Sequence, residues 1–307
     1  MRQLDRQDIV DLLIGAAILG AGGGGDVAEG LALIDQALDA GKVLRLANLE
    51  EVPDETLACC PYLLGAVSPM TEAEARGYAH LPKTSGPAIL AAMDRMERLR
   101  GRRLEATVAC EMGGANTAIA FFVAAMAGGI TLDADPAGRA VPEITHSTFY
   151  LSGLPAEPIC VANNFAETMV LEGVIDDARA ETLVRALAQV SAHDVAAVDH
   201  ALPLHALRQG LIPGTMSAAL RLGQCQREAV EQGRDVAQAL AEVGEGKVVF
   251  AGEVTQAFYE TKGGFTLGHI RLEGPAGAYD ITVKNENMAG NMNGACLLYT
   301  SPSPRDA

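Results

Sequence analysis

The spacing of apolar residues divides the first half of the chain into alternating helices and strands. Apolar side chains recur with the helical period before and after a glycine cluster, and short apolar runs separate the later helical segments. This pattern predicts helices over residues 6–19, 26–40, 85–100 and 115–127 and strands over 42–47, 57–66, 104–110 and 129–135. Because strands joined through helices by short connections are parallel, we expect an α/β domain with a mainly parallel sheet over residues 1–165.

The pattern changes after about residue 166. Helical periodicity at 178–190 and 216–241 is followed by runs of alternating polarity at 246–260, 264–274 and 278–286, which Gly-rich turns join. Alternating strands with short turns are typical of an antiparallel sheet, so we expect a strand-rich α+β domain over residues 166–294.

The last segment, residues 295–307, differs in composition from the rest of the chain. Ser, Pro and Thr replace the Ala, Gly and Val background in "CLLYTSPSPRDA". This string resembles translated sequencing adapter. We therefore expect a non-native tail and an incomplete C-terminal domain.

Charge and composition limit the classes of partner. The chain carries a net charge of −16, and an acidic surface repels nucleic acid and anionic membranes, so we expect neither as a partner. Asp5, Asp8 and Asp11 stand where an export signal needs an apolar core, and the six cysteines include no C-x-x-C pair. We expect a cytoplasmic protein with reduced thiols that binds a small molecule or another protein.

The first candidate for ligand binding is the glycine cluster at residues 20–25. Gly20, Gly22 and Gly25 match G-x-G-x-x-G, but a predicted helix precedes them, whereas a dinucleotide loop follows a strand. We favour a ligand-binding loop between two helices, with bare backbone N–H groups and Asp26 capping the second helix, over a structural junction or a dinucleotide site. The expected substrate-binding residues here are Gly22, Gly23, Gly24, Gly25 and Asp26.

A second candidate combines two segments, 111–116 and 133–146, which follow or end predicted strands and should meet at one edge of the sheet. Carboxylates, an arginine and an amide in such a place could activate water, hold a developing anion and orient a ligand. The expected catalytic residues are Asp133, Asp135, Arg139 and Glu143, and the expected substrate-binding residues are Glu111, Gly113, Gly114, Asn116 and His146.

Other roles for this second candidate stay open. Asp133, Asp135 and Glu143 could hold a divalent metal through oxygen ligands. Alternatively, Asp135 caps the turn at Pro136, Arg139 pairs with Glu143, and His146 is a core residue.

Further polar and thiol groups are weaker candidates. Cys110, beside Glu111, could act as a nucleophile, although no histidine lies near it in sequence. His193, His200 and His205 fall in an expected helix or loop region without metal-ligand spacing, which favours surface or core roles. "KNENM", residues 284–288, ends a predicted strand and forms either a turn or a contribution of the second domain to the site.

Five segments, in order, resemble the S-methyl thiohydantoin desulfurase family, which is associated with hydantoinase and oxoprolinase proteins. They are "LGAGGGGD" (19–26), "EMGGANTAI" (111–119), "DADPAGRAVPE" (133–143), "IPGTMSAALRLG" (212–223) and "KNENM" (284–288). The resemblance covers residues 1–294. It implies an N-terminal α/β domain, a second domain that normally continues further, and removal of sulfur from a cyclic S-methyl thiohydantoin, which releases a thiol and leaves a hydantoin.

Joined to the candidate residues, this resemblance gives a hypothesis for the chemistry. Water activated by Asp133, Asp135 or Glu143 attacks the ring carbon that bears sulfur, while Arg139 and loop N–H groups hold negative charge. We expect no cofactor, although a divalent metal is left open, and either a homo-oligomer or association with a hydantoinase-like protein. The alternatives are a non-catalytic accessory subunit and a metal-dependent cyclic-amide hydrolase.

Overall fold

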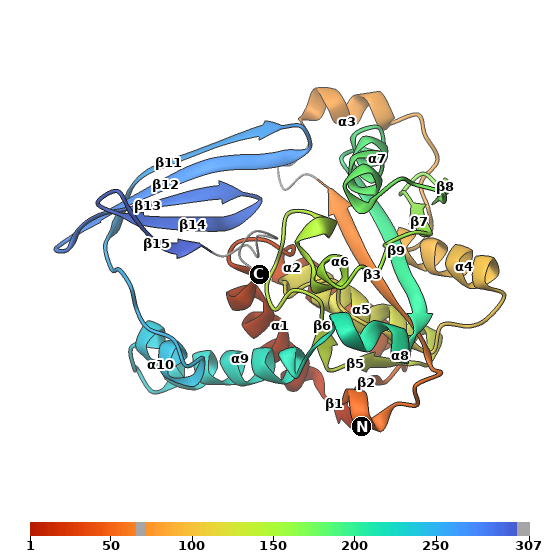
Figure 1. Ribbon diagram of the computed structural model, residues 1–307, viewed down its shortest axis with the longest axis horizontal. Helices are drawn as coiled ribbons and strands as arrows, with labels where there is room; N and C mark the ends of the chain where they lie inside the picture. Colours follow the sequence, from red (N-terminus) through yellow and green to blue (C-terminus); the bar gives the residue numbers. More distant parts are fainter. Residues whose placement is uncertain (66–70, 300–307) are drawn as a thin grey trace.

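An eight-stranded mixed sheet forms the centre of the main body (Figure 1). The computed structural model describes residues 1–65 and 71–299. The strands lie in the order β1 (Arg2–Leu4), β2 (Leu44–Ala47), β5 (Ile130–Leu132), β4 (Ala106–Thr107), β3 (Leu57–Gly65), β9 (Asp194–Pro203), β7 (Ile159–Ala162) and β8 (Thr168–Leu171). β2, β5, β4 and β3 are parallel, and antiparallel strands flank them. The expected α/β fold class is confirmed.

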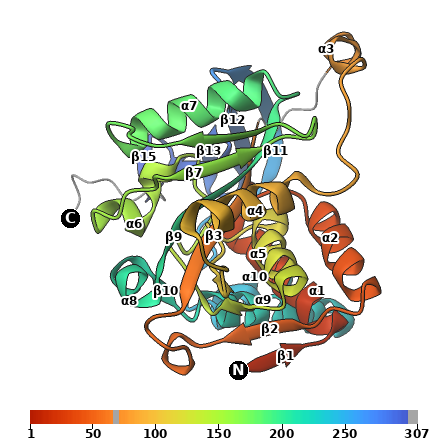
Figure 2. The same ribbon diagram turned by 90° about the vertical axis from the view of Figure 1, so that its right-hand side faces the viewer.

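Helices cover both faces of this sheet (Figure 2). One face packs against α1 (Arg6–Gly20), α2 (Val27–Asp39), α4 (Ala88–Arg100) and α5 (Gly114–Ala127). The other packs against α6 (Thr148–Leu151), α7 (Asp177–Gln189) and α8 (Leu204–Leu207). α3 (Glu72–Tyr78) has no buried residue, and the hydroxyl of Tyr78 donates to the carbonyl of Gln189 at the end of α7. Short 3-10 turns are η1 (Leu49–Glu51), η2 (Ile144–His146) and η3 (Arg208–Gly210).

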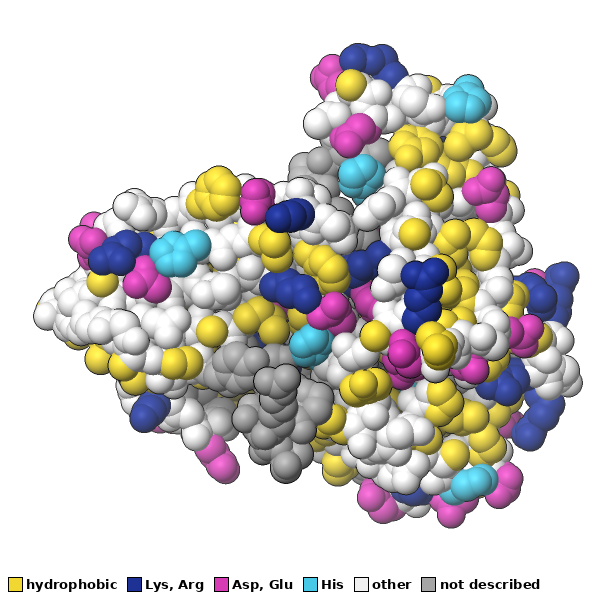
Figure 3. All heavy atoms as spheres, turned by 45° about the horizontal axis from the view of Figure 1, so that its top comes forward, with side chains coloured by type: hydrophobic (Ala, Val, Ile, Leu, Met, Phe, Trp, Pro, Cys, Tyr) yellow, Lys and Arg dark blue, Asp and Glu magenta, His cyan; other side chains and the backbone are white. Residues whose placement is uncertain are grey.

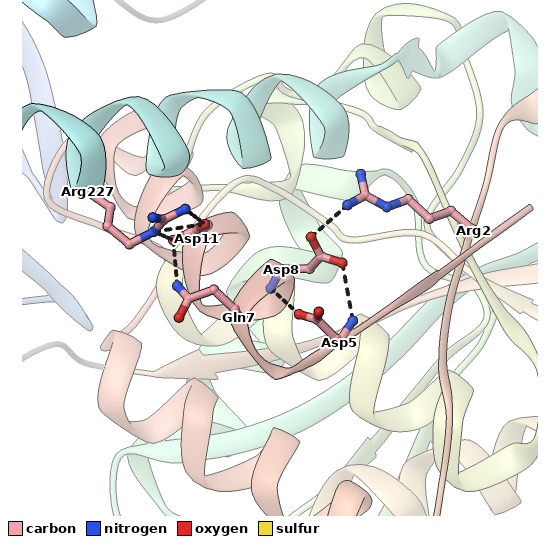
Figure 4. Close-up of polar contacts among 6 residues, drawn as sticks. All are labelled: Arg2, Asp5, Gln7, Asp8, Asp11 and Arg227. Atoms are coloured by element: carbon pink, nitrogen blue, oxygen red, sulfur yellow. Dashed lines mark hydrogen bonds and ion pairs between the residues drawn. The ribbon is translucent and has the colours of Figure 1, made fainter.

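An outer helix, α9 (Thr215–Glu231), crosses α1 with the two backbones in contact. A Cβ on Gly15 would lie 1.7 Å from the carbonyl oxygen of Ala219, so this crossing requires glycine. Asp11 on α1 is 1% exposed and accepts hydrogen bonds from Arg227 of α9, the shortest being Nε to Oδ1 at 3.0 Å and Nη2 to Oδ2 at 2.9 Å (Figure 4). Both oxygens of the buried carboxylate are therefore hydrogen-bonded to a guanidinium.

The C-terminal region forms a separate five-stranded antiparallel sheet, at the left of Figure 1. Its strands are β11 (Glu253–Lys262), β12 (Phe265–Gly274), β13 (Gly277–Lys284), β14 (Glu286–Met292) and β15 (Ala295–Tyr299), each paired with the next. The helix α10 (Val236–Val243) precedes it, and a small ladder pairs β6 (Ala134–Asp135) with β10 (Ile212–Pro213). The expectation of antiparallel strands in this region is confirmed.

Several expected elements differ from the observed ones. The region of His193 and His200 is not helix or loop throughout, because residues 194–203 form the ten-residue strand β9, which pairs with β3. The expected helix 216–241 is two helices, since Gly233 takes a left-handed φ of 63° between them. The expected strand 246–260 begins at Glu253.

The observed helices and strands do not test two predicted boundaries, the domain boundary at residue 165 and the start of the tail at residue 295. The large sheet takes strands from both sides of residue 165, so a division of the chain there stays a prediction. Residues 295–299 of the expected non-native tail pair with β14, whereas residues 300–307, and residue 66 of the expected strand 57–66, lie outside the described residues. The origin of the tail also stays a prediction.

Candidate functional site

A cavity of about 710 Å³ lies where the glycine loop, β3, β9, α7 and the β13–β14 turn come together. Gly22 to Asp26 line it together with Pro136, Val141, Pro142 and Glu143. The two candidate segments of the sequence, one at the glycine cluster and one after β6, therefore share a single pocket. Acidic, basic and histidine side chains lie close together at the junction of the C-terminal sheet with the main body (Figure 3).

The glycine loop has a conformation and a packing that side chains would prevent. α1 ends at Ala21 with a left-handed φ of 49°, and Gly22, Gly24 and Gly25 have φ values of 96°, 76° and 80°. Gly23 does not have a left-handed φ, but a Cβ there would lie 2.1 Å from Oε1 of Glu286. The bare loop therefore lets a carboxyl group from the C-terminal sheet lie directly on its backbone.

The residues on either side of the loop anchor it. Asp26 accepts a hydrogen bond from the backbone N–H of Ala28 at 2.7 Å, so its expected role as the cap of α2 is confirmed. The carbonyl of Gly24 accepts the backbone N–H groups of Ala115 and Asn116, both at 3.0 Å. These N–H groups at the start of α5 are thereby satisfied by protein.

Glu111 is a buried carboxyl group in the cavity wall. Its Oε2 accepts the backbone N–H of Val141 at 2.8 Å, and its Oε1 accepts Nδ2 of Asn116 at 2.7 Å. Asn116 in turn accepts the backbone N–H of Leu63 of β3 at 2.9 Å. Burial raises the pKa of Glu111 to about 7, although both hydrogen bonds oppose the rise.

Glu286, at the start of β14, is the second buried carboxyl group of the cavity. It is 3% exposed, and its Oε2 accepts no hydrogen bond from the described residues. Burial and the neighbouring Glu111 raise its pKa to about 8, which the charges of Arg139 and Arg185 partly oppose. Both carboxyl groups therefore keep their protons to a higher pH than an exposed glutamate does.

Ion pairs form the rim beside these carboxyl groups. Glu143 lines the cavity and accepts a hydrogen bond from Nζ of Lys284 of β13 at 2.6 Å. Arg185 of α7 pairs with Glu181 at 2.5 Å and lies over the ring of Phe265, 3.9 Å from the centroid. The Glu143–Lys284 ion pair and the contact of Arg185 with Phe265 connect the main body to the C-terminal sheet.

Opposite the glycine loop, β3 and β9 contribute a chain of three buried polar side chains. The hydroxyl of Tyr62 donates to Oδ2 of Asp199 at 2.9 Å, and Oδ1 of Asp199 lies 2.7 Å from Nδ1 of His200. All three side chains line the cavity. Burial alone would lower the pKa of His200, but the charge and the hydrogen bond of Asp199 outweigh it and raise the pKa.

Comparison with known families and structures fits this architecture. Residues 7–173 match the model of the S-Me-THD-like N-terminal domain, and residues 175–303 match that of the S-Me-THD-like C-terminal domain. The chain belongs to the S-Me-THD-like family. The family resemblance inferred from the five sequence segments is thus confirmed.

The fold of this S-Me-THD-like chain also has a counterpart among solved structures. A protein from Chromobacterium violaceum, known from an X-ray crystal structure, is 24% identical, with a TM-score of 0.70 over 97% of this chain and 80% of that chain. At this identity the likeness concerns the fold. No curated protein matches the chain.

Two expected catalytic residues of this S-Me-THD-like chain do not line the cavity. Asp133 accepts the backbone N–H of Ser217 at 3.0 Å and also its hydroxyl, so it anchors the start of α9. Asp135 accepts the backbone N–H groups of Ala137 and Gly138, which is the turn-capping alternative, and burial raises its pKa to about 6. A carboxylate at a strand end can accept hydrogen bonds from neighbouring protein groups as readily as from a ligand. Asp133 and Asp135 accept theirs from protein.

Four further expected residues lie behind the cavity wall rather than on it. Gly113 and Gly114 permit close packing, since a Cβ on Gly113 would lie 2.3 Å from the Cα of Gly24. Arg139 donates to the backbone carbonyl of Asn287 at 3.2 Å, and its charge acts on Glu111 and Glu286. Burial lowers the pKa of His146, whose Nδ1 lies 3.6 Å from Glu143.

Asp133, Asp135 and Glu143, the set that could hold a divalent metal, do not assemble. Asp133 faces α9 and Glu143 faces Lys284, and the described part of the chain contains no group of three or more His, Cys, Asp or Glu side chains that could hold a metal ion. Over the same residues, no helix is long and apolar enough to cross a membrane.

The remaining residues of the cavity differ in how far the sequence pointed to them. The polar segment at 284–288 does contribute to the site, through Asn285 and Glu286. Cys110 also lines the cavity, but burial and Glu111 raise the pKa of its thiol well above the ordinary value, which disfavours a thiolate. Tyr62, Asp199 and His200 belong to no spacing motif, and the pairing of β3 with β9 brings Tyr62 to the other two.

Proposed function

We propose that this S-Me-THD-like chain hydrolyses a cyclic S-methyl thiohydantoin, replacing the methylthio group by oxygen. The products are methanethiol and a hydantoin. Family membership supports the substrate class, and the observation that carries the proposal is the pair of buried carboxyl groups in one cavity: both oxygens of Glu111 accept hydrogen bonds, whereas Oε2 of Glu286 accepts none from the described residues. Two carboxyl groups in such different surroundings can serve as base and acid at the same pH.

In the proposed addition step, Glu111 is the base and Glu286 the acid. Glu111, whose two hydrogen bonds favour its carboxylate form, takes a proton from water as the water oxygen bonds to the ring carbon that bears sulfur. Glu286 gives its proton to the adjacent ring nitrogen, so no charge accumulates on the ring. The free Oε2 of Glu286 supports this role, because no described protein group competes for its proton.

In the proposed elimination step, the carbon–sulfur bond breaks and its electron pair leaves with sulfur. Glu286, now a carboxylate, takes the proton of the added hydroxyl group, and the ring carbon becomes a carbonyl. Glu111 returns its proton to solvent, and methanethiolate becomes methanethiol. The sum is one water consumed, one thiol released and one ring N–H gained, with no cofactor in the reaction.

Rigid surroundings favour this assignment over Asp133 and Asp135. Val141 and Asn116 fix both oxygens of Glu111, while the bare backbone of Gly23 receives Glu286. The positive charge of Arg139 acts on both carboxyl groups and can stabilise their ionised forms during turnover.

The test is thiol release by the purified chain. S-methyl thiohydantoins with different ring substituents are incubated with the chain, free thiol is followed with a chromogenic disulfide, and hydantoin is identified by mass spectrometry. We expect both products in equal amounts, and an absence of thiol from every substrate would contradict the proposal.

Two added arms separate the other functions. Activity that requires an added hydantoinase-like enzyme would favour an accessory subunit. Activity abolished by a chelator and restored by a divalent ion would favour metal-assisted hydrolysis.

A further inference from the structure

The backbone at His200 holds an unusual conformation where β3 and β9 pair. Ala58 faces Leu202 and Cys60 faces Asp199, so two residues of β9 oppose one residue of β3. This is a β-bulge, and within it the backbone of His200 has a φ of 43°, a value that residues other than glycine rarely adopt. Such local strain in a buried strand concentrates at functional sites, where the surrounding structure maintains it.

The bulge turns two consecutive polar side chains toward the same cavity. Asp199 and His200 are 3% and 4% exposed, and both line the pocket. Tyr62 and His200 share the two oxygens of Asp199, one oxygen each. The ring of His200 is stacked on Phe149, with centroids 4.4 Å apart. These contacts fix the position of the imidazole on both sides.

One nitrogen of this fixed imidazole is weakly engaged. Nε2 of His200 lies 3.4 Å from the carbonyl of Leu154, at the outer limit of a hydrogen bond. The charges of Asp199 and Asp177 both favour the imidazolium form. Arg185 also lines the cavity, but a guanidinium does not give up its proton, so it cannot serve as an acid.

We propose that His200 protonates the departing thiolate, and that Asp199 and Tyr62 position it for this transfer. The inference rests on the desulfurisation proposed above. Glu111 and Glu286 serve the water and the ring nitrogen, so the sulfur needs a separate donor. Phe149, stacked on His200, and Cys60, paired with Asp199 across the strands, also line the cavity and provide an apolar surface that suits a methylthio group.

The proton balance of this step is complete. As the carbon–sulfur bond breaks, its electron pair remains on sulfur, and sulfur takes the Nε2 proton of His200. Methanethiol leaves, and neutral His200 regains a proton from solvent, to which Glu111 has returned the proton taken from water. No oxidant or reductant is required.

The experiment compares leaving groups rather than single rates. Values of kcat/KM are measured for S-methyl and S-(4-nitrophenyl) thiohydantoins with the wild-type chain and with His200→Gln. An aryl thiolate leaves without protonation, so the variant should lose about 10²-fold or more on the S-methyl substrate and far less on the aryl substrate. An equal loss on both substrates would overturn the proposal while leaving the desulfurisation itself intact.

Further variants distinguish acid, positioning and structural roles. Asp199→Asn should show the same selective loss, because an amide does not sustain the imidazolium. His205→Gln is the matched control, since His205 is exposed on α8 outside the cavity, and it should leave both rates unchanged.

A series measured on the wild-type chain covers the case in which His200→Gln fails to fold. If His200 supplies the proton, kcat/KM should depend weakly on the pKa of the leaving thiol across S-alkyl and S-aryl substrates. A steep dependence would overturn the proposal. A wild-type chain that releases no thiol from any substrate would instead refute the proposed function.

Discussion

Two buried carboxylates of this molecule have opposite surroundings. Asp11, at the crossing of α1 and α9, is 1% exposed and accepts bidentate hydrogen bonds from the guanidinium of Arg227 (Figure 4). Glu286, in the cavity, is 3% exposed and its Oε2 receives no hydrogen bond from the described residues. A buried carboxylate that is paired with a cation stabilises the fold. A buried carboxyl group that lacks such a partner has a raised pKa, so it can keep its proton near neutral pH and is a candidate for acid–base chemistry.

The largest expected effect is on the reaction. Glu286→Gln removes the proposed acid and should lower kcat/KM for thiol release by about 10³-fold, within the usual range for a lost general acid. Glu111→Gln should have a similar effect. Glu260→Gln, on the exposed strand β11, is the control and should keep wild-type activity. Wild-type rates in Glu286→Gln would show that the poorly compensated carboxyl group has no part in the chemistry.

The second effect is on stability and concerns the compensated carboxylate. Arg227→Met leaves the carboxylate of Asp11 buried without its charged partner and should lower the urea concentration at the midpoint of unfolding. Glu286→Gln should instead raise stability above pH 8, because it removes a carboxyl group that is ionised at a buried position. The comparison fails if Arg227→Met unfolds at the wild-type urea concentration.

A third variant tests how closely the glycine loop holds Glu286. The backbone of Gly23 permits alanine, but the added Cβ would collide with the carboxyl group of Glu286. Gly23→Ala should therefore displace the proposed acid and lower kcat by up to about 10²-fold. Gly86→Ala, where a Cβ meets no atom within 4 Å, is the matched control. Equal kcat values for the two variants would contradict the contact.

The smallest effect separates capping from ligand binding at Asp26. Asp26→Ala removes the cap of α2 and should cost about 1 kcal/mol of stability, read from the shift of the urea midpoint. Asp26→Ser keeps a capping oxygen and should restore most of this stability with KM unchanged. A raised KM in Asp26→Ser would instead show that the carboxylate contacts substrate, as the sequence predicts.

Periodicity and turn chemistry predicted much of the fold. The helices at 6–19, 26–40 and 115–127 agree with α1, α2 and α5 to within one residue at each end. The strand β9 was missed, because its Ala-rich sequence has little β preference and Asp199 and His200 interrupt its apolar pattern. Local patterns report poorly on a strand whose partner is distant in the chain.

The candidate site was predicted in part for the same physical reason. The glycine loop and Glu111 stand in segments whose composition departs visibly from their surroundings. Tyr62 and Asp199 lie 137 positions apart and meet only through strand pairing, which no spacing reveals. Asp133 follows a strand as a ligand-binding carboxylate would, yet the hydroxyl of Ser217 occupies it. Sequence identified the region of the cavity, and the side-chain contacts separated the carboxyl groups that line it from those that hold α9 and the turn after β6.

The pH dependence of kcat/KM for thiol release tests the central claim most directly. Glu111 must be ionised, so the rate should rise as the pH passes about 7, and Glu286 must be protonated, so the rate should fall beyond about 8. Because the two groups interact, these limits belong to the pair. On an S-aryl substrate, whose thiolate leaves without a proton from His200, the account predicts a bell for the wild-type chain and loss of its alkaline limb in the residual activity of Glu286→Gln. A rate that is flat from pH 5 to about pH 9 would contradict it.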